Sequence, residues 1–140
     1  MVYSGMNEGD KTEKITLNMG LVDLGQMDLL VQEGFYANRT DFLRTATRRQ
    51  LAMHAEAVGQ TVARKTLILG VQSVTRAELE RHQAAGTSLS IRVLGLATVD
   101  ADISAELAAA TIDSVEVLGA FRASREVKEA LAQRTVGGGR

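Results

Sequence analysis

The sequence predicts an α/β protein in two parts, a β-α-α unit followed by a β-α-β-α-β-α repeat region with parallel strands. One alternating segment ahead of two helical stretches predicts the first part, and a Leu-Gly pair that recurs three times predicts the second. The expected division is a flexible arm (1–13), the β-α-α unit (14–58), a linker (59–65), the repeats (66–134) and a flexible tail (135–140).

Composition and charge favour a folded protein of the cytoplasm. Of the 140 residues, 45% are hydrophobic and 24% are charged, and none is cysteine, which excludes disulfides and thiolate metal sites. We expect no membrane span, since no apolar run approaches about 18 residues, and the polar residues 7–14 lack the apolar core of a signal peptide. The net charge of −1 means that nucleic-acid binding would need locally placed basic groups.

Polar and apolar residues alternate along residues 14–19, which predicts one half-buried strand. No second strand follows before the helices, and a lone strand leaves its backbone groups unpaired. We therefore expect the same strand of a second chain as its partner, in a homodimer. The apolar face holds Ile15, Leu17 and Met19, and the polar face holds Lys14, Thr16 and Asn18.

Two helices are predicted after this strand. Asp23 is the expected N-cap of the first, over about residues 23–33, and Gly34 is its expected left-handed end. The second begins at Asn38, which is followed three positions later by an acidic residue, and its apolar stripe continues to about Val58. The arginines on the polar side of this helix are Arg44, Arg48 and Arg49.

The segment Lys14–Leu51 resembles the ribbon-helix-helix family of CopG/ParD-type and MetJ/Arc-type DNA-binding proteins. The resemblance rests on the strand KITLNM, on the segment LVQEGFYANRTDFLR around the inter-helix turn and on their separation; Gly20 stands where the family often has proline. It implies an intertwined dimer whose antiparallel ribbon reads bases in the major groove, while the start of the second helix holds a phosphate. The dimer core would comprise Ile15, Leu17, Met19, Leu30, Phe42, Leu43 and Ala46.

The resemblance also implies which residues contact DNA. The base readers would be Lys14, Thr16 and Asn18. Lysine can donate to guanine, asparagine can pair with adenine, and threonine can hydrogen-bond a base or touch a thymine methyl group. The phosphate contacts would be Asn38, Arg39, Thr40 and Arg44. An arginine-rich helix face is also typical of a solvated surface, or of ion pairs with acids such as Glu56.

The Leu-Gly pairs of the second part are spaced by 25 and 24 residues, and each follows a β-like run and precedes a hydroxyl N-cap. The pairs are Leu69-Gly70, Leu94-Gly95 and Leu118-Gly119; the runs are 66–69, 89–94 and 112–118; the caps are Thr75, Ser104 and Ser124. This order predicts parallel strands in a small open sheet or a short solenoid. Neither end of that sheet has a proline or a charge cluster that would block pairing, so we expect this region to oligomerise or to bind a partner.

The sequence contains no recognisable catalytic, metal or cofactor motif. His54 and His82 are the only histidines, and no phosphate-binding glycine loop is present. We therefore expect neither an enzyme nor a metal or cofactor site.

The predicted function is that of a bacterial transcriptional regulator, a repressor, which binds an inverted-repeat operator in double-stranded DNA as a dimer or higher oligomer on the nucleoid. Two alternatives remain. One is the antitoxin of a toxin-antitoxin module, in which a short tail wraps the toxin. The other is a scaffold that organises DNA and polymerises through the repeats.

Overall fold

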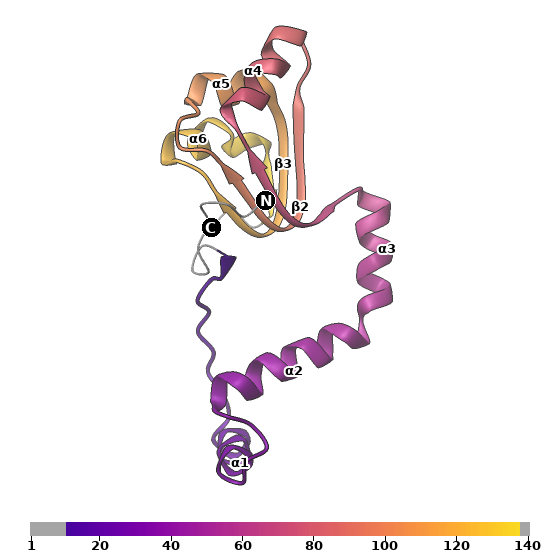
Figure 1. Ribbon diagram of the computed structural model, residues 1–140, viewed down its shortest axis with the longest axis vertical. Coiled ribbons are helices and arrows are strands. Elements are labelled where there is room, and N and C mark those ends of the chain that lie inside the picture. The colour runs from indigo at the N-terminus through magenta and orange to yellow at the C-terminus, as the bar shows by residue number, and fades with distance from the viewer. Residues whose placement is uncertain (1–10, 138–140) are drawn as a thin grey trace. The chain divides into compact units, whose positions relative to one another are not determined.

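The computed structural model describes residues 11–137, so most of the predicted flexible arm and the last three residues of the predicted tail lie outside the described residues. The described chain forms two compact units (Figure 1). The N-terminal unit comprises Lys14–Thr61, and the C-terminal unit comprises Val62 onward together with residues 11–13.

The N-terminal unit begins with residues 14–20 outside any helix or strand. The strand predicted at residues 14–19 therefore stays a prediction, because one chain offers it no partner strand. Helix α1 (Leu21–Gln32) starts two residues before Asp23, so the prediction of Asp23 as its N-cap was wrong. Gly20 is the N-cap, and Asp23 lies in the first turn, where its negative charge interacts favourably with the helix dipole.

Two further helices complete this part of the chain, α2 (Arg39–Met53) and α3 (Ala55–Lys65). The predicted N-cap of α2 is confirmed, since the Asn38 side chain accepts a hydrogen bond from the Asp41 N–H at 2.8 Å. The prediction of one helix to about Val58 was wrong, because His54 leaves the helical conformation at φ −108° and ψ 13° and its N–H bonds Leu51 in a tighter turn. The residues predicted as a linker, 59–65, lie in α3 and are helical.

The C-terminal unit is a four-stranded sheet in the order β1-β2-β3-β4, and all neighbouring strands are parallel. The parallel arrangement predicted from the sequence is confirmed. The strands are β1 (Ile68–Val74), β2 (Leu89–Val99), β3 (Ile112–Arg122) and β4 (Thr135–Gly137). The first three extend past the predicted runs, and β4 was missed: it forms from residues predicted as flexible tail, which pair with Val115–Val117 of β3.

Three helices connect the strands, α4 (Arg76–Ala85), α5 (Ala105–Thr111) and α6 (Arg125–Ala130), and the 3-10 turn η2 (Ala132–Arg134) precedes β4. Figure 1 shows the helices side by side along one face of the sheet. Crossovers between successive parallel strands share one hand, so they fall on one side. The predicted N-caps are confirmed: the side chains of Thr75, Ser104 and Ser124 accept hydrogen bonds from the N–H groups of Glu78, Leu107 and Val127.

The core of the C-terminal unit lies between these helices and the sheet. Leu79 of α4, Ala108 of α5 and Val127 of α6 are fully buried against strand residues that include Val93 and Val117. The opposite face of the sheet, here called the open face, carries the alternate strand residues. Two apolar rows cross the open face in register: Leu69, Leu94 and Leu118 form one, and Val71, Leu96 and Ala120 form the other.

The glycines of the three Leu-Gly pairs also align across the sheet, as Gly70, Gly95 and Gly119. Their φ angles are +133°, +140° and +117°, a backbone conformation that residues other than glycine rarely adopt. A Cβ at Gly95 would collide with the carbonyl oxygen of Gly70, and one at Gly119 would collide with that of Gly95. The close approach of successive strands therefore requires glycine at these two positions.

Candidate nucleic-acid interface

The segment ahead of α1 exposes both its apolar and its polar side chains. Ile15 is 84% exposed and Leu17 is 63% exposed. The polar residues Lys14, Thr16 and Asn18 are exposed too, and within residues 11–137 their side chains have no hydrogen-bond or ion-pair partner. This segment therefore offers one apolar face that is not covered and one polar face whose donors and acceptors are free to bind a ligand.

The N-terminal unit buries little of its apolar surface. Met27, 3% exposed, is the one hydrophobic residue of Lys14–Thr61 that is fully buried. Of the predicted dimer-core residues beyond Ile15 and Leu17, Ala46 is exposed, and the half-buried ones are Met19, Leu30, Phe42 and Leu43. Sequence reasoning missed further exposed apolar side chains, although their residue types were a signal: Leu21, Val22, Leu29, Phe35 and Leu51. The N-terminal unit thus exposes apolar side chains that a folded protein usually buries in a core or in an interface.

The turn between α1 and α2 is fixed by reciprocal capping. Besides the Asn38 cap described above, a carboxylate oxygen of Asp41 accepts a hydrogen bond from the Ala37 N–H at 2.9 Å. The ring of Tyr36 packs edge-on against Phe42 at a centroid distance of 5.0 Å. The backbone N–H groups of Arg39 and Thr40 have no acceptor within the described chain, so the start of α2 keeps unpaired donors of the kind that bind anions.

An ion pair links α1 to the start of α2. The Arg39 guanidinium donates two hydrogen bonds to the Asp28 carboxylate, from Nε and Nη2, each at 2.8 Å. These hydrogen bonds, together with the positive charge of Arg39, hold the pKa of Asp28 below its usual value. The sequence gave no signal for this pair, because the two residues stand 11 positions apart. Arg39 is therefore engaged within the chain, whereas the resemblance assigns it to phosphate.

Arg44, Arg48 and Arg49 project from α2 as exposed side chains. Within residues 11–137 none of the three has an ion-pair partner. Glu56, considered as a partner from the sequence, accepts a hydrogen bond from Gln60 instead, at 3.4 Å. Because the positive charges are not neutralised in the chain, the polar side of α2 attracts anions locally although the net charge is −1.

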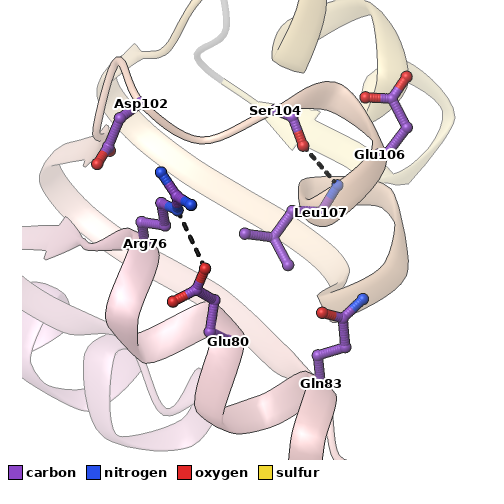
Figure 2. A pocket seen from close by; sticks show the side chains of 7 residues that line it. All are labelled: Arg76, Glu80, Gln83, Asp102, Ser104, Glu106 and Leu107. Atoms are coloured by element: carbon purple, nitrogen blue, oxygen red, sulfur yellow. Dashed lines mark hydrogen bonds and ion pairs between the residues drawn. The ribbon is translucent and has the colours of Figure 1, made fainter.

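The C-terminal unit has a pocket of about 460 Å³ between α4 and the start of α5 (Figure 2). Its wall includes the carboxylates Glu80, Asp102 and Glu106, and its one cation, Arg76, is paired with Glu80 at 3.0 Å. Nothing in this arrangement resembles a nucleophile beside a base. Within the described residues, no three His, Cys, Asp or Glu side chains gather in a metal-binding group, and no helix is long and apolar enough to cross a membrane.

Comparison with family models matches residues 10–128 to the Ribbon-Helix-Helix transcriptional regulator family. No curated protein and no solved structure gives a significant match. The matched range starts ahead of the exposed alternating segment and ends in α6, so it covers the N-terminal unit and most of the C-terminal unit, and it confirms the resemblance seen in residues 14–51. The chain therefore belongs to the ribbon-helix-helix family of transcriptional regulators.

Proposed function

We propose that this protein is a sequence-specific DNA-binding repressor that acts as a homodimer. The observation that carries the proposal is the segment Lys14–Met19, which lies outside any helix or strand with the side chains of Ile15 and Leu17 exposed. An antiparallel ribbon with the same segment of a second chain pairs its backbone groups and covers Ile15 and Leu17 together. The half-buried apolar residues of α1 and α2 then complete the dimer core.

Base recognition is assigned to the polar face of that ribbon. A two-stranded ribbon fits the major groove, where each base pair presents a distinct pattern of donors and acceptors. Lys14, Thr16 and Asn18 supply the matching groups, and none is used within the described chain. Because the dimer is two-fold symmetric, its operator is an inverted repeat.

Phosphate binding is assigned to the start of α2 and to the arginines on its polar side. The free N–H groups of Arg39 and Thr40 and the positive end of the helix dipole suit a phosphate oxygen, and Asn38 orders this turn. Arg44 adds an unpaired cation one turn further along. These contacts set the position of the protein on DNA but carry no sequence information.

The folded C-terminal unit favours a regulator over the antitoxin alternative, since toxin-binding tails are typically poorly ordered alone. A scaffold function would predict DNA binding without sequence preference. We propose that the protein acts in the cytoplasm on the nucleoid, as its assignment to DNA requires.

Selection of bound duplexes from a random DNA pool by the full-length protein, at roughly physiological salt, tests the proposal. Enrichment of an inverted repeat is expected. Weak, salt-sensitive binding without any enriched sequence would contradict sequence-specific regulation and favour the scaffold.

Asn18→Ala sharpens this test at one residue. A lost bidentate contact should weaken binding to the selected operator by about 1–3 kcal/mol and relax the preference at one position of each half-site. Gln32→Ala, which removes an exposed amide from α1, is the matched control and should leave binding unchanged. Equal loss on all DNA sequences would contradict base reading by Asn18.

Arg44→Gln tests the phosphate assignment separately. Loss of one phosphate contact should weaken binding uniformly over sequences and reduce the slope of log K against log salt by about 1. Arg81→Gln, which removes an exposed cation from α4, is the control of equal charge. An identical change in slope for both variants would show that only net charge matters.

A further inference from the structure

Strand β1 forms one edge of the sheet and pairs only with β2 within the described residues. Its seven residues, ILGVQSV, include no charged residue and no proline. Natural sheet edges are usually protected by charges, prolines or shortness, and the opposite edge strand β4 has only three residues. The β1 edge is thus a long, unprotected template for another strand.

The glycine column gives a second sign that a strand lies beyond β1. At Gly95 and Gly119 the space beside the α-carbon is filled by the carbonyl of the preceding strand. Gly70 has the same conformation, with φ +133°, but nothing lies within 4 Å of the position that its Cβ would take. Gly70 on the edge strand β1 therefore has the same backbone geometry as the glycines of β2 and β3. Unlike them, it has no neighbouring strand on that side within the described residues.

Gln72 gives a third sign, from the same strand. Its side-chain oxygen Oε1 is buried and has no hydrogen-bond partner. A buried acceptor without a partner is costly, so native structures usually supply a donor from somewhere. A primary amide both donates and accepts, so two copies of Gln72 that meet across a two-fold axis can satisfy each other.

We infer that β1 of one copy pairs antiparallel with β1 of a second copy, around Gln72, and joins two four-stranded sheets into one. The partner is a second copy because the edge is self-complementary: the strands are equal in length and neutral, and each carries the same unpaired amide oxygen of Gln72. Pairing of β4 with β1 would be head-to-tail, and β4 offers only three residues to a seven-residue edge. The joined sheet also continues the leucine row of the open face, in which Leu69 is 69% exposed.

This association does not depend on DNA binding, and four forms of the full-length chain separate it from ribbon dimerisation. They are the wild type, the ribbon variant Leu17→Lys, the edge variant Leu69→Lys/Ser73→Lys, and the combination of both variants. The edge variant places lysines of the two copies on the same face near the axis, where like charges oppose pairing. Sedimentation equilibrium over a wide range of concentration gives the mass of each form.

A matched control introduces the same residue type, lysine, on the inner strand β3 in place of the edge strand β1. Leu118→Lys in β3 puts a lysine in the same row across the sheet as Leu69. Strand β3 already carries a cation, Arg122, in the row of Ser73, so this one substitution gives β3 the same two positive positions as the edge variant. The ribbon variant is expected to remain a dimer, alone or with Leu118→Lys. Adding the edge substitutions should weaken its self-association at least roughly tenfold and release monomers. Amide hydrogen exchange in β1 should rise on the same dilution that releases them.

Three results would overturn the inference. A monomeric ribbon variant would show that β1 does not associate, and equal dissociation by Leu118→Lys would place the contact on the open face. Masses of the ribbon variant that grow without limit would show head-to-tail assembly. Conversely, if the edge variant alone is monomeric, β1 pairing stands and the proposed ribbon dimer fails.

Discussion

The two units of this chain differ in how much of their structure one copy can complete. The N-terminal unit fully buries one hydrophobic side chain, Met27, whereas the C-terminal unit builds a core of fully buried residues from Val74 to Leu131. Burial of apolar surface is the main favourable term in folding, so the second unit can be stable by itself, whereas the first leaves apolar side chains that the proposed dimer would cover. One copy of the sequence therefore completes the core of the C-terminal unit but not that of the N-terminal unit.

The largest expected effect is the loss of the C-terminal unit in Gly95→Ala. The added methyl group meets the Gly70 carbonyl and the backbone would have to keep φ +140°, so we expect a loss of more than about 4 kcal/mol in the free energy of unfolding. Urea denaturation followed by circular dichroism measures it.

Gly25→Ala is the control for this substitution in the N-terminal unit. Gly25 lies in α1, where an added Cβ meets nothing within 4 Å, so alanine should stabilise the helix by about 0.5–1 kcal/mol. Destabilisation of similar size at both positions would show that the glycine column is not a special constraint.

The next largest effect is expected from Leu17→Ala in the N-terminal unit. If a second copy covers Leu17, truncation should cost about 2–3 kcal/mol per site, seen as weaker dimerisation or as concentration-dependent unfolding. If the side chain stays 63% exposed, as in the single chain, the change should stay within about 0.5 kcal/mol.

Thr16→Ala provides the matched control on the opposite face of the ribbon. It should leave the dissociation constant of the dimer unchanged while it weakens operator binding. A similar loss of dimerisation in Thr16→Ala and Leu17→Ala would contradict the assignment of the two faces.

A smaller effect is expected at the residue that precedes the sheet of the C-terminal unit. Thr66, between α3 and β1, has φ +56°, which is costly for a β-branched residue. Thr66→Gly should raise the free energy of unfolding by about 0.5–1 kcal/mol, measured by thermal denaturation. Thr61→Gly, inside α3, should lower it, and stabilisation by both would contradict relief of strain at Thr66.

The smallest effect concerns pH. Because Arg39 holds the pKa of Asp28 below its usual value, the pair stabilises the N-terminal unit above about pH 4, and this contribution is lost as the pH falls through the pKa of the folded state. Arg39→Gln should return that pKa towards its usual value, as a carboxyl NMR titration would show.

Asp113 is the internal control for this titration in the C-terminal unit. Its pKa is held low chiefly by the hydrogen bond from Ser90, and also by those from Ser88 and Ser114. Asp113 should therefore titrate at the same pH in the wild type and in Arg39→Gln. A shift of both carboxyl groups would show that Arg39→Gln perturbs the whole chain.

Local signals made much of the fold predictable. Hydroxyl caps at Thr75 and Ser124 act within one helical turn, and the Leu-Gly spacing reflects strand register, so both can be read from neighbouring residues. Strand β4 was missed because it contains three residues and exists only by pairing with β3. The Arg39–Asp28 pair was missed for a similar reason, since it depends on how α1 and α2 cross and not on spacing.

The stack of strand-helix units has a consequence for the length of this protein. Each strand pairs only with its neighbours, and the helices pack in the same sequence, so no closed core fixes how many units there are. Duplication of the 24 residues from Leu94 to Val117 would add one strand, one helix and one more Leu-Gly pair in register. Chains with four or five units could therefore arise by duplication without any new kind of contact.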